Sequence, residues 1–274
     1  MDMWEEMITP VDTPRNPFDG ASYTTSYETL ASLRPVCMAG THEDQYGRTD
    51  MERLADDRIV LVHTPRSLSQ GTEEATQNNK VPLVLFFHGL GSHPWKTALY
   101  GTAWRRLAHQ HGFIVAFAVG TDCGAQHDRR CGFRIRDPAS DVAYARNIID
   151  HVCRIRAVDE SRIYCVGHSN GAIFSSVLAQ RLGGDVFAAM VNVMGGFGKE
   201  AAEVIREAAD KPVPLLFVTG TKDDYKHGCE CAHRFFSANG YPTSIKVLDG
   251  VAHVYPAGDE EERMWRFLES HVRP

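Results

Sequence analysis

The stretch from 162 to 174 constrains the fold more than any other part of the chain. Residues 162–166 (Arg-Ile-Tyr-Cys-Val) have the composition of a buried strand, and 172–174 (Ala-Ile-Phe) begin a helical pattern. Between them stands Gly-His-Ser-Asn-Gly, whose glycines permit a sharp turn and a close approach of strand and helix. A strand, turn and helix of this kind form a nucleophile elbow, which lifts its central serine clear of the sheet. Ser169 is therefore the candidate nucleophile.

Apolar runs alternate with helical patterns along most of the chain. Strands are predicted at about 58–63, 81–87, 113–119, 162–167, 188–194, 214–219 and 244–249, and helices at about 97–111, 138–155, 171–182, 199–209, 228–239 and 259–271. Strands that alternate with helices indicate an α/β fold, with a mostly parallel sheet covered by helices on both faces. We expect residues 58–274 to form one catalytic domain, and the polar, proline-containing residues 1–57 to form an irregular N-terminal extension.

A serine hydroxyl needs a base and an orienting acid before it can attack at neutral pH. An apolar run at 215–218 leads into Thr-Gly-Thr-Lys-Asp-Asp, which places Asp223 and Asp224 in the loop after a strand. His253 follows the strand predicted at 244–249 in the same way. The order serine, aspartate, histidine is the α/β-hydrolase arrangement and differs from the chymotrypsin-like and subtilisin-like orders. His253 is the predicted base, and Asp223 or Asp224 is the acid.

The apolar run at 81–87 has the pattern of a central strand, and it ends in His-Gly-Leu-Gly at 88–91. A loop of this kind can aim a backbone N–H at the negative charge that develops on a substrate oxygen. The second such donor normally belongs to the residue after the nucleophile. The amides of Leu90 and Asn170 are the predicted oxyanion donors.

Several segments resemble one group of α/β-hydrolases, the polyhydroxyalkanoate (polyhydroxybutyrate) depolymerases and feruloyl esterases. They are Val-Asp-Glu-Ser-Arg-Ile-Tyr at 158–164, the Gly-x-Ser-Asn-Gly-Ala that follows, and Ala-His-Gln-His-Gly-Phe-Ile-Val at 108–115. The resemblance extends from about Arg58 to about Phe267. It implies the α/β-hydrolase fold and hydrolysis of carboxylic esters, with Asp223 matching the acid of the group's Gly-Thr-x-Asp motif and His253 matching its histidine.

Two departures from that group concern residues around the substrate. Members often have Cys-Trp-x-Trp after the fourth strand and a tryptophan two residues past the histidine, where this chain has Cys-Gly-Phe-Arg at 131–134 and Tyr255. Both positions would touch the substrate, so Phe133 and Tyr255 are candidate pocket walls. His88 and His168 complete the candidate pocket, although a structural role is the commoner one for histidines at such positions.

The cysteines leave the redox state open. Their number, seven, is odd, so at least one thiol is free or pairs outside the chain. Relatives in the resembled group are often exported and disulfide-bonded. Cys123 and Cys131 flank a loop short enough to close, which makes them the best candidate pair.

The segment His-Gly-Cys-Glu-Cys-Ala-His at 227–233 offers four possible zinc ligands at alternate positions. An extended segment would put all four on one face. However, the residues up to Asn239 and Gly240 have the pattern of a helix and its end, and a helix would bring only Cys229 and His233 onto one face. The helical interpretation is favoured, so no metal site is predicted.

Composition argues against several other functions. The net charge is -6 and the pI about 6.1, so the chain lacks the basic footprint that binds nucleic acid or anionic lipid. No apolar stretch is long enough to span a bilayer, and the acidic start Met-Asp-Met-Trp-Glu-Glu is unlike a secretory signal peptide. We expect a soluble protein, cytoplasmic if the chain is complete and secreted if a signal was removed. The oligomeric state is left open.

These observations predict a serine esterase that acts on a small-molecule or polymeric ester through an acyl-enzyme and needs no cofactor. Two alternatives stay open. A peptidase or amidase could use the same three residues, and a hydrolase fold can serve as a non-catalytic binding protein. The lack of a gating domain favours the esterase over the peptidase, and the complete serine, acid and base argue against a binding protein.

Overall fold

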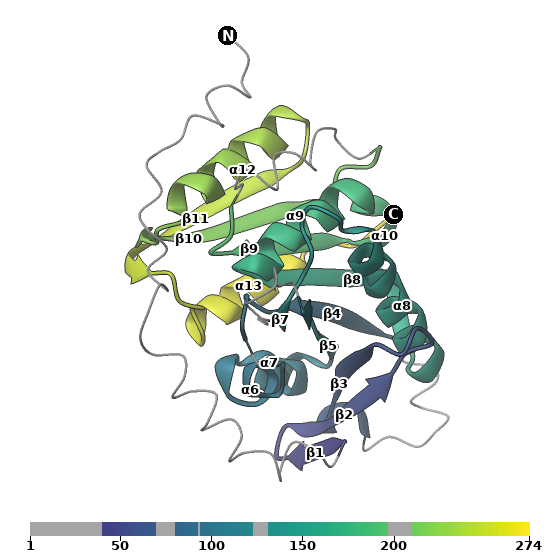
Figure 1. The fold of residues 1–274 in the computed structure, drawn as a ribbon. Coiled ribbons are helices and arrows are strands. Elements are labelled where there is room, and N and C mark those ends of the chain that lie inside the picture. Colours follow the sequence, from purple (N-terminus) through teal and green to yellow (C-terminus); the bar gives the residue numbers. More distant parts are fainter. Residues whose placement is uncertain (1–39, 70–79, 93, 123–130, 197–209) are drawn as a thin grey trace.

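The computed structural model describes residues 40–69, 80–92, 94–122, 131–196 and 210–274. The main feature of these residues is a nine-stranded sheet (Figure 1). The strand order is β1-β2-β3-β5-β4-β8-β9-β10-β11. These strands are β1 (Thr41–Asp44), β2 (Gly47–Arg53), β3 (Ile59–Pro65), β4 (Val81–Phe87), β5 (Ile114–Ala118), β8 (Val158–His168), β9 (Ala189–Val193), β10 (Leu215–Lys222) and β11 (Thr243–Ala252). A separate two-stranded sheet pairs β6 (Thr121–Asp122) with β7 (Cys131–Gly132).

The helices connect the strands and cover the sheet. They are α4 (Arg66–Ser69), α6 (Pro94–Lys96), the π-helix η1 (Thr97–Gly101), α7 (Trp104–His111), α8 (Ala139–Ile155), α9 (Asn170–Arg181), α10 (Gly183–Val186), α12 (Lys226–Ala238) and α13 (Asp259–Glu269). The helix predicted at 199–209 lies outside the described residues. None of the described helices combines the length and the apolar composition needed to cross a membrane.

The sheet is mostly parallel, as predicted. From β5 through β4, β8, β9 and β10 to β11, every neighbouring pair is parallel, whereas β1, β2, β3 and β5 pair antiparallel with one another in that order. All seven predicted strands are present, with ends that differ by a few residues.

The prediction of an irregular extension up to residue 57 is wrong for residues 41–53. These residues form β1 and β2, which extend the sheet beyond β3. Their sequences, Thr-His-Glu-Asp and Gly-Arg-Thr-Asp-Met-Glu-Arg, are polar because many of the side chains stay in contact with water. A polar strand at the edge of a sheet carries little of the apolar pattern by which strands are recognised. Residues 1–39 lie outside the described part of the chain.

The single helix predicted at 97–111 is interrupted. Between η1 and α7, Thr102 adopts an extended conformation with φ −143° and ψ 160°. The Ala103 N–H is turned toward α13, where it donates to the carboxylate of Glu261 at 2.8 and 2.9 Å. A contact between residues 158 positions apart thus ends one helix and starts the next, which no local pattern could predict.

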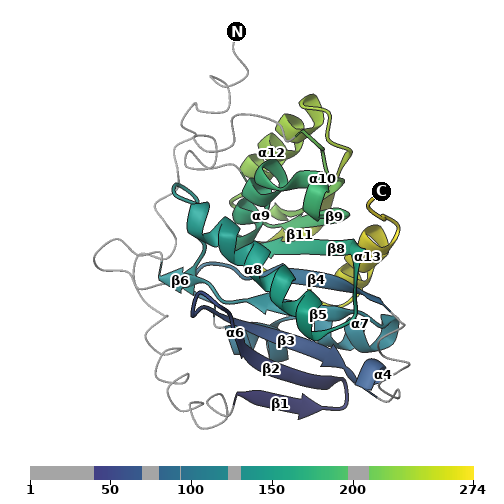
Figure 2. The same cartoon turned by 90° about the vertical axis from the view of Figure 1, so that its right-hand side faces the viewer.

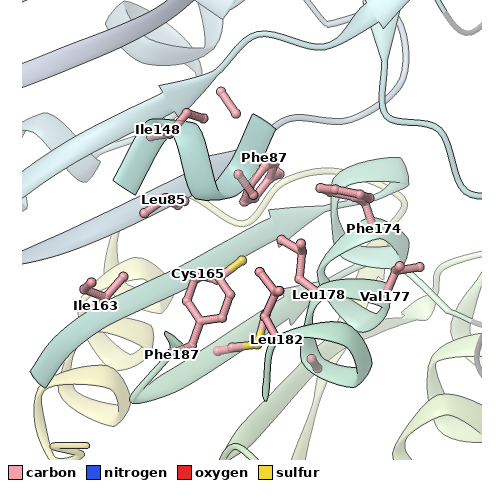
Figure 3. Close-up of a cluster of buried hydrophobic side chains, with 14 of the residues drawn as sticks. Leu85, Phe87, Ile148, Ile163, Cys165, Phe174, Val177, Leu178, Leu182 and Phe187 are labelled. Atoms are coloured by element: carbon pink, nitrogen blue, oxygen red, sulfur yellow. The ribbon is translucent and has the colours of Figure 1, made fainter. Parts of the chain in front are cut away.

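Side chains alternate between two apolar layers, one on each face of the sheet. In β4, Leu83, Leu85 and Phe87 face one layer, and Val84 and Phe86 face the other. The first layer contains buried residues of α8, α9 and α12, and the second contains those of α7 and α13. Figure 2 shows these helices on opposite sides of the sheet. Figure 3 shows how side chains of α9, such as Phe174 and Leu178, pack onto the first layer beside Cys165 of β8.

This arrangement brings the predicted site residues to one edge. Ser169 follows β8, Asp223 follows β10 and His253 follows β11, while the loop at 88–91 follows β4. These four strands are parallel to one another. Because the carboxyl ends of parallel strands meet at the same edge of a sheet, all four segments lie where such folds place their ligands.

Candidate active site

The turn at Ser169 is tight and strained. Ser169 has φ 53° and ψ −118°, a backbone conformation that costs energy for a residue with a Cβ. Its N–H is held by the Val193 carbonyl of the neighbouring strand at 2.9 Å. A Cβ on Gly171 would lie 2.1 Å from the Phe87 carbonyl oxygen, and one on Gly167 would lie 2.3 Å from the carbonyl oxygen of Gly171. Only glycine allows strand and helix to approach so closely at these two positions.

Three of the predicted residues form a continuous hydrogen-bonded line. Ser169 Oγ lies 2.9 Å from His253 Nε2, and His253 Nδ1 lies 2.8 Å from Asp223 Oδ1. The imidazole is 18% exposed, whereas the carboxylate is fully buried. With Nδ1–H donating to the carboxylate, Nε2 is the nitrogen that can accept the serine proton.

The structure distinguishes the two candidate acids. Asp224 is exposed, while Asp223 accepts hydrogen bonds from Thr219 Oγ1 and the Tyr225 N–H, each at 2.9 Å, besides that from His253. Burial by itself raises the pKa of Asp223, but these three donors outweigh it and hold the pKa below its ordinary value. The buried side chain is therefore an anion, fixed in place to orient the imidazole. Nothing in the sequence pattern indicates this role for Thr219.

The loop at 88–91 lies directly against the elbow. A Cβ on Gly89 would lie 3.2 Å from Cβ of Ser169. The Gly91 N–H donates to the Cys131 carbonyl at 2.8 Å, and buried His88 lies 2.8 Å from the Gly89 carbonyl through Nδ1 and accepts the Gly120 N–H at Nε2. His88 thus shapes the loop. Leu90, between these anchors, is carried beside the nucleophile.

The side chain of Asn170 has a role that the sequence did not reveal. Its Oδ1 accepts the Phe133 N–H at 2.7 Å, and its Nδ2 donates to the Phe133 carbonyl at 3.1 Å. The same residue begins α9, where the first N–H groups have no partner inside the helix. We call this pair of bonds the Asn170 clamp, since it fastens the elbow to the segment that also holds Gly91.

Phe133 itself is not a pocket wall, and that prediction is wrong. Its ring is 1% exposed and packs between Phe87 and Phe174, with ring centroids 5.1 and 5.3 Å away. An aromatic side chain in this segment gains more from the apolar layer than from the edge of a polar site. The backbone of Phe133, held in the Asn170 clamp, is the part that reaches the site.

His168 and Tyr255 form a row of rings that ends at His253. The ring of His168 stacks on that of His253 at 5.8 Å, and the ring of Tyr255 meets His168 edge-on at 5.2 Å. Burial, with a smaller effect of His253, lowers the pKa of His168 to about 3. A neutral His168 can support His253 without opposing its protonation. The Tyr255 hydroxyl accepts the Trp104 Nε1–H at 2.7 Å. His168 therefore packs directly against the base, and Tyr255 packs against His168.

The segment at 227–233 lies in α12, so the helical interpretation is correct. His227 Nε2 lies 3.5 Å from Cys231 Sγ, and Arg234 donates to the same sulfur at 3.1 Å. Cys229 and Ala232 point into the apolar layer. Among the described residues, no three His, Cys, Asp or Glu side chains come together as a metal site would require.

The candidate disulfide cannot be placed, because Cys123 lies outside the described residues. Its proposed partner Cys131 is half-buried, and its thiol donates to the Gly120 carbonyl at 2.8 Å. The sulfur is also 3.8 Å from His88 Nε2. Cys131 therefore belongs to the supports of the loop at 88–91.

The structural comparisons decide the fold. An S-formylglutathione hydrolase from Agrobacterium tumefaciens superposes with a TM-score of 0.60, covering 85% of this chain and 95% of its own at 15% identity. An esterase from Pyrobaculum calidifontis superposes at 0.57 over 91% and 92% of the two chains at 18% identity. This chain has the α/β-hydrolase fold. A ferulic acid esterase is a further α/β-hydrolase neighbour, with a TM-score of 0.59 over 80% of this chain and 94% of that one at 17% identity.

In sequence, the chain is similar to proteins that are named as hydrolases and esterases. An uncharacterised hydrolase of Acanthamoeba polyphaga mimivirus is 27% identical over 258 residues, which are 81% of this chain and 79% of the relative. A bifunctional acetylxylan esterase/xylanase of Neocallimastix patriciarum is 27% identical over 171 residues, 61% of this chain but 22% of that protein. No family model matches the chain.

Proposed function

We propose that this chain is a serine-dependent hydrolase of carboxylic esters that works through an acyl-enzyme. The observation that carries the proposal is the line of hydrogen bonds from Ser169 through His253 to Asp223, at 2.9 and 2.8 Å, beside a strained elbow. The geometry matches what nucleophilic catalysis requires, a hydroxyl within reach of a base that a buried acid orients.

In this mechanism His253 takes the Ser169 proton while Oγ attacks the ester carbonyl carbon. Asp223 holds the imidazole and stabilises its positive charge, and the amides of Leu90 and Asn170 receive the negative oxygen. His253 then returns the proton to the departing alcohol, which leaves the acyl group on Ser169. His253 then takes a proton from water as the water oxygen attacks the acyl carbon. The bond from Ser169 Oγ to that carbon breaks, the proton passes to Ser169 Oγ, and the acid leaves. These residues supply both proton transfer and charge stabilisation without a cofactor.

Esters are favoured over amides by the known proteins that this chain is similar to. The sequence relatives are named as a hydrolase and an acetylxylan esterase, and two of the structural neighbours are named as esterases. A peptidase or amidase would use the same three residues, but no feature of the described site favours it. A binding protein without activity would have no physical need to keep serine, base and acid in hydrogen-bonded line.

Replacing the nucleophile tests the proposal directly. We expect Ser169→Ala to lower kcat/KM for p-nitrophenyl acetate by at least about 10³-fold, because the covalent route is lost. Labelling by a fluorophosphonate should disappear with it, and circular dichroism and Tm should stay close to the parent values. Labelling that persists at another residue, together with surviving activity, would overturn the assignment of Ser169.

Metal independence is a second expected outcome. Because the proposed residues and backbone amides account for each step, dialysis against a strong chelator should leave the rate of ester hydrolysis unchanged. Loss of activity on chelation and its return with zinc would contradict the proposal. It would also direct attention to His227 and the two cysteines of α12.

A further inference from the structure

Apolar surface is exposed to solvent at Tyr225, whose ring contacts His253, and at Val254, the residue after His253 in the chain. Tyr225 is 45% exposed and Val254 is 56% exposed. The ring centroid of Tyr225 lies 4.6 Å from that of the imidazole, with the ring planes inclined by 44°. Val254 directly follows His253 in the chain. A ligand that covers apolar surface beside a reactive group removes that surface from water, which lowers the free energy of the complex. We call the two residues the His253 shelf.

The shelf is firmly positioned. The Tyr225 N–H donates to Asp223 Oδ1 at 2.9 Å, and the Tyr225 carbonyl accepts the Cys229 N–H in the first turn of α12 at 2.9 Å. The Val254 N–H donates to the Ala252 carbonyl at 2.8 Å. The bond from the Tyr225 N–H to Asp223 therefore fixes Tyr225 relative to the acid, so its surface is preorganised for binding.

The chemistry of the base assigns this surface to one part of the substrate. His253 must place its Nε2 proton on the oxygen of the departing alcohol, which requires a hydrogen-bond distance between them. The group attached to that oxygen then lies beside the imidazole, and the exposed ring of Tyr225 is in contact with that imidazole. We infer that the His253 shelf binds the alcohol portion of the ester and selects apolar, above all aromatic, alcohols. The inference rests on the proposed function and adds to it one side of the substrate.

The shelf has a consequence for the second half of the reaction. An alcohol bound there can replace water in attacking the acyl-enzyme. His253 takes the alcohol proton, the alcohol oxygen forms a bond to the acyl carbon, and the bond from Ser169 Oγ to that carbon breaks. The proton then passes to Ser169 Oγ, so a new ester leaves and the hydroxyl is restored. The chain should therefore transfer acyl groups to aromatic alcohols in preference to methanol.

The experiment measures how one acyl-enzyme divides between acceptors. The full chain is acetylated with p-nitrophenyl acetate in the presence of benzyl alcohol or methanol, and acetate, benzyl acetate and methyl acetate are quantified by chromatography. Because the acetyl-enzyme is the same in every reaction, the product ratio reports how well each acceptor binds and reacts and not the rate of acylation, and the intrinsic reactivity of each alcohol cancels when a variant is compared with the parent chain. The variants are Tyr225→Ala, Tyr225→Phe and Val254→Ser. Val272→Ser is the matched control, since Val272 is a valine of similar exposure, 60%, near the C-terminal end.

We expect the parent chain to favour benzyl alcohol over methanol by about tenfold, a value typical of a partly enclosed apolar contact. Tyr225→Ala should reduce that preference to about parity and Val254→Ser should reduce it in part. Tyr225→Phe keeps the ring and should keep the preference, as should Val272→Ser. Equal use of both alcohols by the parent chain, or a preference that survives Tyr225→Ala, would overturn the inference.

A further control separates the two proposals. The same variants are assayed with ethyl esters of increasing acyl length, where a shelf for the alcohol should leave the acyl preference of the chain unaltered. A changed acyl preference with an unaltered benzyl alcohol preference would assign the shelf to the acyl side and contradict the inference alone. Absence of any acetyl-enzyme, or activity that does not need Ser169, would contradict the proposed function instead.

Discussion

A single buried carboxylate controls how the imidazole of His253 is held. Asp223 receives donors from a strand, a loop N–H and the imidazole itself, and its neighbour Asp224 points to water. Adjacent residues in a loop project in different directions, so only one of the two can meet His253. The contact of Thr219 with the second carboxylate oxygen keeps the first oxygen directed at the ring.

We therefore expect Asp223→Asn to be far slower than Asp224→Asn. The amide in place of Asp223 can present its NH₂ group to Nδ1 and so favour the wrong imidazole tautomer, which costs about 10⁴-fold in kcat in the serine-protease example. Asp224→Asn should keep most of the parent activity because its side chain is exposed. Both variants are compared against one ester at neutral pH. The reverse ranking would show that the acid is Asp224.

The elbow also depends on the absence of a side chain at Gly171. A Cβ on Gly171 would lie 2.1 Å from the Phe87 carbonyl oxygen, a distance that only a backbone shift could relieve. We expect Gly171→Ala to lower the free energy of unfolding by about 1–3 kcal/mol or more, measured by urea denaturation. Gly101→Ala is the matched control, because its nearest neighbour would lie 3.5 Å away, an ordinary contact. Similar losses for both would contradict the close approach at the elbow.

At the scale of elements, the Asn170 clamp joins two segments far apart in the chain. It ties the start of α9 to the backbone of Phe133, next to β7, and the Cys131 carbonyl of β7 holds Gly91. Of the two proposed oxyanion donors, the Asn170 amide lies at the start of α9 and the Leu90 amide lies in the loop that contains Gly91. The clamp therefore fixes the spacing between the Leu90 and Asn170 amides.

Removing the clamp should affect the transition state more than substrate binding. We expect Asn170→Ala to lower kcat by about 10- to 100-fold with little change in KM, since misplaced oxyanion donors matter only when charge develops on the oxygen. Tm should fall by a few degrees at most. Asn147→Ala is the control, as Asn147 makes one side-chain bond to Asp56 at the surface of α8. A KM effect without a kcat effect would show that the clamp acts on substrate binding.

The elements that the sequence predicts well are those with their own apolar pattern. The buried strands and α8, α9, α12 and α13 are such elements, and each is found within a few residues of its predicted place. The strands β1 and β2 are polar and become strands because β2 pairs with β3 and β1 pairs with β2. The break at Thr102 depends on the bond from the Ala103 N–H to Glu261, 158 positions away. These features are properties of the assembled sheet and not of a local segment.

The site likewise has some features that the sequence predicts and others that depend on the assembled structure. Ser169, Asp223 and His253 follow strand ends, so the topology alone brings them together. Spacing along the chain does not encode the contact of Asn170 with the Phe133 backbone, the bond from Thr219 to Asp223, or the ring contact of Tyr225 with His253. Phe133 was misassigned because its segment suggested a pocket, whereas packing against Phe87 and Phe174 decides where its ring lies.

At the scale of the whole molecule, buried histidines make stability depend on pH. Burial lowers the pKa of His63 and of His168 to about 3, from an ordinary value of 6.5. Between these values the unfolded chain binds protons that the folded chain does not, so stability falls as pH drops from about 6.5 toward 3. Glu261 acts in the opposite direction, because burial raises its pKa to about 7 from 4.5 and its stabilisation is lost as pH rises through 7.

His63 and His168 together outweigh Glu261, so acid is expected to weaken the fold. We expect the free energy of unfolding to fall between pH 6 and pH 5, measured by urea denaturation. Each histidine contributes up to about 1.4 kcal/mol per pH unit. His63→Asn removes one of them while leaving a side chain that can bind Thr49, the partner of His63 at 3.0 Å. The variant should show a shallower dependence on pH, and an identical slope would show that His63 does not carry it.

The position of β11 has a consequence for the time at which the protein becomes reactive. This strand pairs at the edge of the sheet, next to β10, and among the described strands it is the one farthest along the chain. The elbow can form as soon as β8 has docked, yet its serine meets no base until β11 has paired and carried His253 into place. During synthesis on the ribosome, a chain that ends before β11 is thus expected to stay inert toward the esters around it, and reactivity arrives together with β11.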